Sequence, residues 1–123
     1  MLSILRRRLA TGLATTRYPE VAEVPPPAFR GMPVLDDAAC LGDGACAAIC
    51  PTDAIGVSPT TDGWTWRLDR AACTACGLCM EACPYAALGV SQTFELASRT
   101  RSDLIETVHF SRFLTARKTE GAR

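Results

Sequence analysis

The sequence of 123 residues contains one histidine, His109, and no apolar stretch long enough to span a bilayer. It also lacks a Ser/His/Asp set, a glycine-rich phosphate loop and a pair of catalytic carboxylates. The apolar positions of residues 1–16 are interrupted by three arginines at 6–8, whereas a membrane-spanning helix needs about 20 apolar residues. Basic residues interleaved with aromatics are missing as well, which argues against nucleic-acid binding. We therefore expect no bond-making chemistry, and we assign His109 no role.

Cysteine is the residue type that the chain has in excess. There are seven cysteines, together with nine glycines and eight prolines, so we expect a small hydrophobic core. An odd number of cysteines and the lack of a secretory leader argue against a disulfide scaffold and favour a reducing compartment. We expect metal ligation to supply much of the folding free energy and the metal-free chain to be poorly folded.

The cysteines fall into two runs. The run from Cys73 to Pro84 has the spacing CxxCxxCxxxCP, which is typical of bacterial-type ferredoxins that hold a cubane iron–sulfur cluster. The run from Cys40 to Pro51 has the same spacing, except that Asp43 stands in the place of the second cysteine. The two runs predict two cluster sites and a role in electron transfer.

The two runs belong to a longer internal repeat. Residues 35–57 and 68–90 share twelve identities in 23 aligned positions. Each half predicts a short first strand (33–35 and 64–68), a ligand loop, a short helical turn near its third cysteine position, and a second strand (55–57 and 88–90). Asp62-Gly63 supplies the turn between the halves. The predicted fold class is α+β: a duplicated bacterial ferredoxin-like core with short hairpin strands and two short helices.

The spacing also predicts which cysteines share a cluster. In two-cluster chains of this pattern, the last cysteine of each run ligates the other cluster. Two sets of ligands follow. Cluster I takes Cys40, Asp43, Cys46 and Cys83, and cluster II takes Cys73, Cys76, Cys79 and Cys50. A zinc site is the main alternative for the cysteines, but zinc sites usually use paired CxxC units without the CxxxCP extension. Trp64, Trp66 and Tyr85 are expected to pack around the cluster region.

Asp43 leaves several outcomes open for cluster I. A carboxylate oxygen is a harder ligand than a thiolate, so iron held there is bound less tightly. The site then holds a [4Fe-4S] cluster with Asp43 or water on one iron, holds a [3Fe-4S] cluster, or is partly degenerate. The alternative is that Asp43 is a tolerated surface substitution. At the cluster II site we expect a [4Fe-4S] cluster.

The two ends of the chain differ from its middle. Residues 1–35 carry a net charge of +3, residues 36–95 of −6, and residues 96–123 of +3. We expect residues 1–32 to form an amphipathic helix over the first sixteen positions, followed by a proline-rich connector. Residues 33–91 form the predicted two-cluster domain, and residues 92–123 form a predicted docking extension. In that extension, Asp103 and Glu106 suggest a capping box for a helix over 104–117.

The repeat resembles the two-cluster bacterial ferredoxin family over residues 33–91. The flanking segments narrow this resemblance: Thr11-Gly12, Tyr18-Pro19, Phe29-Arg30-Gly31 and the stretch from Gln92 to Ala97 are similar to the ferredoxin-like subunit of complex I and its relatives. Among these, the chain resembles the formate hydrogenlyase and membrane-bound group 4 nickel-iron hydrogenase branch. Asp43 departs from the cysteine that the family generally has at this position.

The resemblance implies an electron-transfer relay subunit, not a catalyst on its own, seated among other subunits of a hydrogenase or complex I-like assembly. It implies a cytoplasmic location, peripheral on the inner face of the cell membrane, with the first helix along the membrane arm. Neither nucleic acid nor a small-molecule substrate is expected as a partner. The alternative is a free soluble ferredoxin that shuttles electrons between enzymes. A redox or iron sensor is a third class, although the sequence encodes no effector domain.

Overall fold

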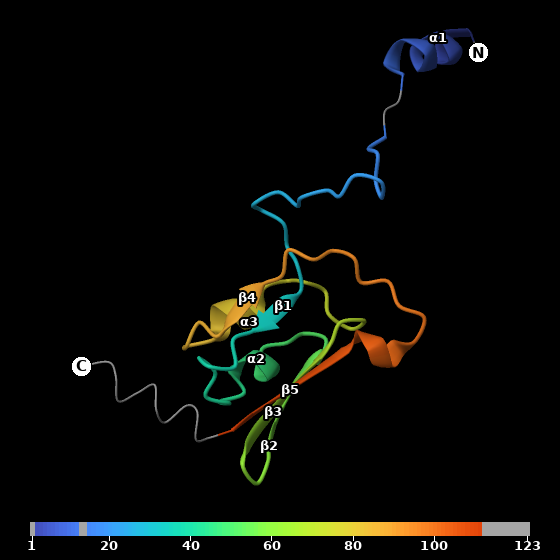
Figure 1. Cartoon of the computed structure of the whole chain (residues 1–123). Helices are drawn as coiled ribbons and strands as arrows, with labels where there is room; N and C mark the ends of the chain where they lie inside the picture. Colours follow the sequence, from blue (N-terminus) through green and yellow to red (C-terminus); the bar gives the residue numbers. More distant parts are fainter. Residues whose placement is uncertain (1, 13–14, 112–123) are drawn as a thin grey trace.

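The computed structural model describes residues 2–12 and 15–111 and shows a small α+β fold (Figure 1). Its described elements, in chain order, are α1 (Leu2–Thr11), β1 (Pro33–Leu35), α2 (Ala45–Ala48), β2 (Ile55–Pro59), β3 (Gly63–Asp69), α3 (Leu78–Ala82), β4 (Leu88–Val90), the 3₁₀ turn η1 (Arg101–Leu104) and β5 (Ile105–Ser111). The strands form two antiparallel sheets, one with the order β1-β4 and one with the order β2-β3-β5. The α+β class and the strands expected in the two repeats are confirmed.

The two sequence repeats have matching backbone connections. The first strand of the first repeat, β1, pairs with the last strand of the second, β4, while β2 and β3 form the hairpin between them. The amide of Asp36 donates to the carbonyl of Ala87 at 2.8 Å, and the amide of Asp69 donates to the carbonyl of Ala54 at the same distance. Equivalent residues therefore make equivalent bonds, and each links one repeat to the other.

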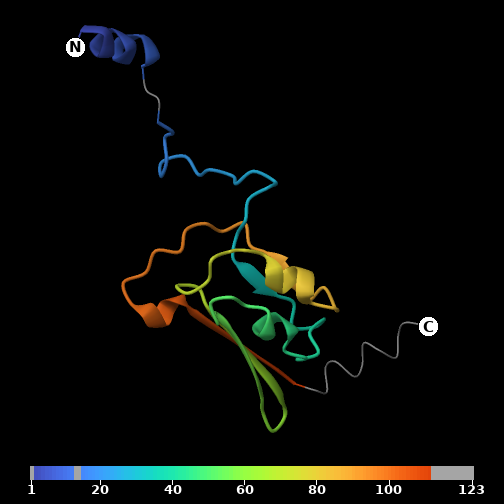
Figure 2. The same ribbon diagram turned by 180° about the vertical axis from the view of Figure 1, so that it is seen from behind.

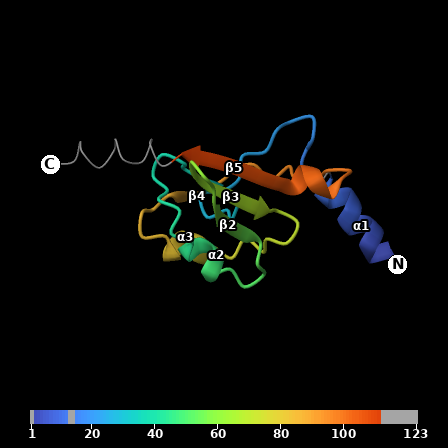
Figure 3. The same ribbon diagram turned by 90° about the horizontal axis from the view of Figure 1, so that it is seen from below.

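The helices α2 and α3 start in the same way. The residue before each is a glycine in the left-handed region, Gly44 at φ 78° and Gly77 at φ 86°. Glycine adopts this conformation without the steric cost of a Cβ atom, so the chain can reverse from the ligand loop into the helix. The two helices lie side by side on one side of the strands (Figure 3). The short helices expected near the third cysteine position are thus confirmed.

The hydrophobic core lies between the strands and the two short helices. Trp66 and Leu68 of β3 are its largest fully buried side chains. Alternate residues of a strand point to the same face, so Trp64 shares this inner face with them. Buried cysteines belong to the same core, which places thiol groups where other small domains have aliphatic side chains.

The prediction of a helix over 104–117 is wrong for the residues that the structure describes. Residues 105–111 form β5, which pairs along β3 in a register that sets Trp64 against Phe110 and Asp69 against Ile105. Asp103 accepts a hydrogen bond from the Ser98 hydroxyl at 2.6 Å and does not cap a helix. The open edge of β3 and burial of the Phe110 side chain favour the strand over the helical periodicity of the sequence. Residues 112–117 lie outside the described residues.

A first helix forms as expected, but α1 ends at Thr11, short of the expected sixteen residues, and residues 15 and 16 are not helical. Leu13 of the apolar pattern lies outside the described residues. None of the residues of α1 is buried, and Figures 1 and 2 draw it apart from the strands. In the part of the chain that the structure describes, no helix is long and apolar enough to cross a membrane.

The proline-rich connector meets the segment after β4. The Tyr18 hydroxyl donates a hydrogen bond to the Glu95 carboxylate, and the rings of Tyr18 and Phe94 lie 5.9 Å apart. Further along, a Cβ atom on Gly31 would lie 1.9 Å from the carbonyl oxygen of Ser91, so only glycine fits there. Two flanking segments distant in sequence thus pack against each other beside the β1-β4 sheet.

Candidate metal centre

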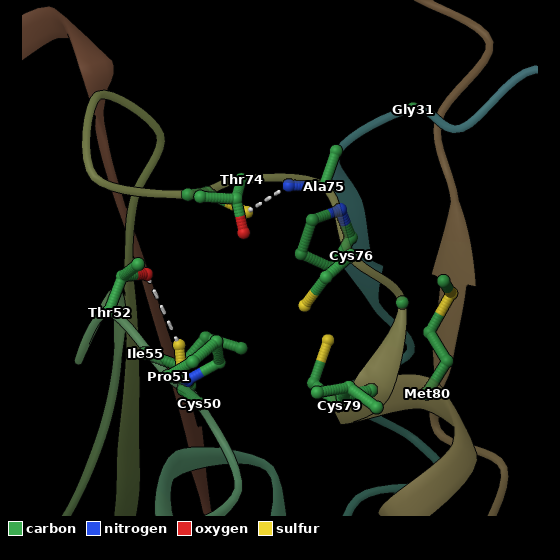
Figure 4. Close-up of a pocket in the computed structure, with 14 residues that line it drawn as sticks. Gly31, Cys50, Pro51, Thr52, Ile55, Thr74, Ala75, Cys76, Cys79 and Met80 are labelled. Atoms are coloured by element: carbon green, nitrogen blue, oxygen red, sulfur yellow. Dashed lines mark hydrogen bonds between the residues drawn. The ribbon is translucent and has the colours of Figure 1, made fainter.

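Four cysteines line one pocket between the two repeats. Three of them, Cys73, Cys76 and Cys79, come from the loop and helix of the second repeat. The fourth, Cys50, is the last cysteine of the first run. Figure 4 shows the sulfur atoms of Cys76 and Cys79 turned toward each other, with Cys50 on the facing wall. These are the cysteines that the spacing assigns to cluster II, and the fold gathers them around one cavity.

The residues assigned to cluster I also lie together. Cys40 and Cys46 are buried at the two ends of the first ligand loop. Burial raises the pKa of the Cys40 thiol, and the nearby Cys83 and Asp43 raise it further. Burial likewise raises the pKa of Cys46, to which Cys40 and Asp43 add. These mutual electrostatic effects place the three sulfur atoms and the carboxylate in one neighbourhood.

The two groups of cysteines adjoin each other through the short helices. Cys46 lies in α2 and Cys79 in α3. Burial raises the pKa of Cys79 to about 11, and charge on Cys73, Cys46 and Cys76 adds to this effect. Cys79 therefore has neighbours in both groups, so that cofactors held by the two groups would lie close together.

Backbone amides point at the sulfur atoms of the last cysteine of each run. The amide of Ala54 donates to Cys50 Sγ at 3.3 Å, and the amide of Ala87 donates to Cys83 Sγ at 3.4 Å. Ala54 and Ala87 occupy the same position of the repeat, so the sequence identity there was a signal of a shared role. Hydrogen bonds of this kind stabilise charge on a thiolate.

Cys50 shows the consequence of these donors. Burial acts to raise its pKa, but hydrogen bonds from the amide and hydroxyl of Thr52 and from the amides of Ala54 and Ile55 outweigh burial and lower it. A cysteine must be deprotonated to bind iron, so this environment favours the ligating form. The role of Thr52 was not anticipated from the sequence, because the second repeat has Tyr85 at this position.

Asp43 is exposed and already has one hydrogen-bond partner. Its Oδ1 accepts a bond from the amide of Ala45, the first residue of α2, at 3.3 Å. The second oxygen of the carboxylate has no such bond among the described residues. Asp43 therefore combines a local hydrogen bond to the first residue of α2 with a location near Cys40 and Cys46.

The three aromatic residues expected near the site behave differently. Trp66 is fully buried and Trp64 is partly buried, and both belong to the packing around the cysteines. A Cβ atom on Gly42 would lie 2.5 Å from the Trp64 ring, so this indole rests directly on the first ligand loop. Tyr85 is 43 % exposed and does not form part of the core.

The donor set fits an iron–sulfur cluster. Such a cluster binds one cysteine on each of its iron atoms, so its ligands surround a cavity, as the four cysteines of the pocket do. Within residues 2–12 and 15–111, no group of three His, Cys, Asp or Glu side chains is arranged to hold a single metal ion. The indole N–H of Trp66 is buried and has no hydrogen-bond partner among these residues.

These features define an iron–sulfur electron-transfer domain. Residues 39–87 match the family described as 4Fe-4S dicluster domain, a stretch that includes all seven cysteines and both CP pairs. A comparison with curated proteins finds no match.

Among solved structures, the chain is similar to one from the membrane-bound sulfane sulfur reductase, an archaeal respiratory membrane complex. The two chains are 30% identical, with a TM-score of 0.64, and the similarity covers 80% of the present chain. It covers 55% of that chain, so the present chain spans about half the length of its structural relative. The likeness extends beyond the matched residues 39–87 and therefore includes parts of the flanking segments.

Proposed function

We propose that this chain holds two iron–sulfur clusters and relays electrons as a subunit of a membrane-associated oxidoreductase complex. A cluster of this type supplies one-electron transfer when bound. Two ligand sets follow from the spacing. Cluster I takes Cys40, Cys46, Cys83 and, as the fourth ligand, Asp43; cluster II takes Cys50, Cys73, Cys76 and Cys79. The meeting of Cys50 with the three cysteines of the other repeat around one pocket is the observation that carries this proposal.

The contact between the two ligand groups supports a relay. Cys46 and Cys79 are near enough to influence each other electrostatically, and each lies in one of two helices packed side by side. The distribution of exposure agrees with this view, because Cys76 is exposed while Cys40, Cys46 and Cys79 are buried. The polypeptide thus buries three of the cysteines and partly covers three others, and it leaves the positions of Cys76 and Asp43 open to an electron partner.

We infer that the complex is of the hydrogenase or complex I type, with formate hydrogenlyase-like assemblies as the specific candidate. The flanking segments named above carry this inference together with the similarity to a chain of a respiratory membrane complex. The exposed apolar residues and three arginines of α1 suit a surface that contacts a membrane or a membrane subunit. The association would be peripheral, through the complex, on the cytoplasmic side.

A soluble shuttle ferredoxin is the second candidate. The compact core of the described residues favours it, since residues 33–111 contain both sheets and all the cysteines. The helix α1, none of whose residues is buried, favours the subunit.

Anaerobic affinity purification from the native host tests the proposal. We expect other subunits to co-purify, together with at least about seven iron atoms and a similar amount of acid-labile sulfide per copy of this chain. A stable, cluster-bearing monomer without partners would support the shuttle. Zinc in place of iron, or the lack of acid-labile sulfide, would contradict both candidates.

A further inference from the structure

In the part of the chain that the structure describes, Trp66 carries a buried polar atom without a partner inside the core that contains the cysteines. Its side chain is fully buried, and its Nε1–H has no hydrogen-bond partner among residues 2–12 and 15–111. More than nine tenths of buried polar groups in proteins are hydrogen-bonded, so an unpartnered N–H in a core calls for an explanation.

The Cys46 sulfur is an acceptor close to this N–H. Cys46 is buried in the same core cluster as Trp66. Burial raises the pKa of the Cys46 thiol, and the Trp66 indole acts against this rise, as a donor close to the sulfur does. The contact nevertheless falls short of a formed hydrogen bond to the neutral thiol. A thiolate, which carries a full negative charge, is a far stronger acceptor than a thiol.

Trp66 lies in the central strand β3, which has a paired strand on each side. Trp66 pairs with Val57 of β2 and with Val108 of β5. Trp64, two residues earlier on the same face, rests on Gly42 of the first ligand loop. The counterpart of Trp66 in the first repeat is Pro33 of β1, which lines the pocket of the other four cysteines and has no side-chain N–H to donate. The donor is therefore specific to the site that contains Asp43.

We propose that the Trp66 indole N–H donates a hydrogen bond to the Cys46 thiolate, or to an adjacent sulfide, when cluster I is bound, and that this bond raises the reduction potential of cluster I relative to cluster II. The inference rests on the proposed function. Reduction adds negative charge, which a hydrogen-bond donor at a sulfur atom stabilises. Trp66 is thus a residue that tunes the reduction potential of cluster I.

A redox titration followed by paramagnetic resonance tests this assignment. In the Trp66→Phe variant, we expect one of the two midpoint potentials to become more negative and the other to stay unchanged. Trp64→Phe is the control for packing, because Trp64 rests on the loop between Cys40 and Cys46. We expect the shift in Trp66→Phe to be clearly larger than any shift in Trp64→Phe, and equal shifts in the two variants would overturn the inference. Replacement of Trp66 by benzothienylalanine, which keeps the shape of the indole but has no N–H, should reproduce the shift of Trp66→Phe.

A second measurement detects the hydrogen bond directly in the wild-type chain. With ¹⁵N-labelled indole rings, electron–nuclear double resonance of reduced cluster I should show coupling to an exchangeable proton and a ¹⁵N nucleus, and both should be lost in the benzothienylalanine variant. Full iron content with unshifted potentials and no such coupling would overturn the inference while leaving the proposed function intact. A wild-type chain devoid of acid-labile sulfide would instead overturn the proposed function, and the inference with it.

Discussion

The indole of Trp64 lies against Gly42, so that a side chain at Gly42 would come within 2.5 Å of the ring. Trp64 belongs to β3 in the second repeat, whereas Gly42 belongs to the ligand loop of the first. The loop between Cys40 and Cys46 is therefore shaped by a strand from the other half of the chain. Aligned with Gly42, the second repeat has Ala75, which is also at positive φ but lies beside the pocket of the other cysteines.

Gly42→Ala should destabilise the cluster I site. Gly42 has a φ of +72°, and the added methyl group would also press on the Trp64 ring. We expect the free energy of unfolding to fall by about 3 kcal/mol, because backbone strain and overpacking act together. Gly44→Ala is the control, because Gly44 has a φ of +78° but open space around it, and strain alone should cost about 1 kcal/mol. The measurement is the rate at which visible absorbance is lost in guanidinium chloride under anaerobic conditions. Equal rates in Gly42→Ala and Gly44→Ala would contradict the role of Trp64.

Asp43→Cys should make cluster I more resistant to loss of iron. A thiolate binds the iron of such clusters more tightly than a carboxylate, so the variant should retain a four-iron signal where the wild type yields a three-iron signal after brief exposure to air. Low-temperature paramagnetic resonance with iron analysis distinguishes the two. Asp43→Asn is the control, since its side-chain oxygen can still accept the bond from Ala45. Identical spectra and iron contents in the wild type and Asp43→Cys would show that Asp43 does not bind iron and only accepts the hydrogen bond from Ala45.

Phe110→Ala should reveal how much β5 contributes to the core. Phe110 is 6 % exposed and lies opposite Trp64 in the β3-β5 register. Loss of a buried phenylalanine side chain typically costs about 3 kcal/mol or more. Thr107→Ala, on the exposed face of the same strand, should change stability by less than about 0.5 kcal/mol. Thermal unfolding of the cluster-loaded protein measures both, and a Phe110→Ala protein as stable as Thr107→Ala would show that β5 is dispensable.

The contact between Tyr18 and Glu95 should weaken at high pH. The hydrogen bond to Glu95 raises the pKa of Tyr18, and burial and the negative charge of Glu95 add to this. A raised pKa means that the folded contact favours the neutral phenol, so its stabilising effect is complete below the ordinary tyrosine pKa of about 10 and is lost as the pH rises through the raised value. Carbon-13 NMR of labelled tyrosine follows this titration, with Glu95→Gln expected to move the midpoint of Tyr18 down. An unchanged midpoint would show that the two side chains do not meet in solution.

Much of the ferredoxin-like core could be predicted from the sequence. The spacing of the cysteines and the identities between the repeats predicted the short strands, the two short helices and the pairing of Cys50 with the second run, because these depend on local geometry and on residues that recur in both halves. The ligand sets stay predictions. Ala54 and Ala87 could have been recognised as donors, since the repeat preserves them beside Cys50 and Cys83.

The C-terminal segment shows where prediction from sequence ended. The residues from Leu104 to Phe110 have apolar positions that suit a helix, yet they form η1 and β5. The sequence carries no local signal for the open edge of β3, because that edge exists only once the β2-β3 hairpin has folded. The ion pair of Arg101 with Asp69, at 2.7 Å, and that of Arg70 with Glu106 then hold the segment in this register.

The sequence by itself determined the chemistry that we expect of this protein, because the cysteines and their spacing form short motifs along the chain. Only the tertiary structure decided what surrounds these cysteines: the Trp64 indole on the first loop, the buried Trp66 in one core with Cys46, the pairing of β5 with β3, and the exposure of Cys76. Such contacts join residues far apart in the chain, and their energies depend on packing that no local pattern encodes.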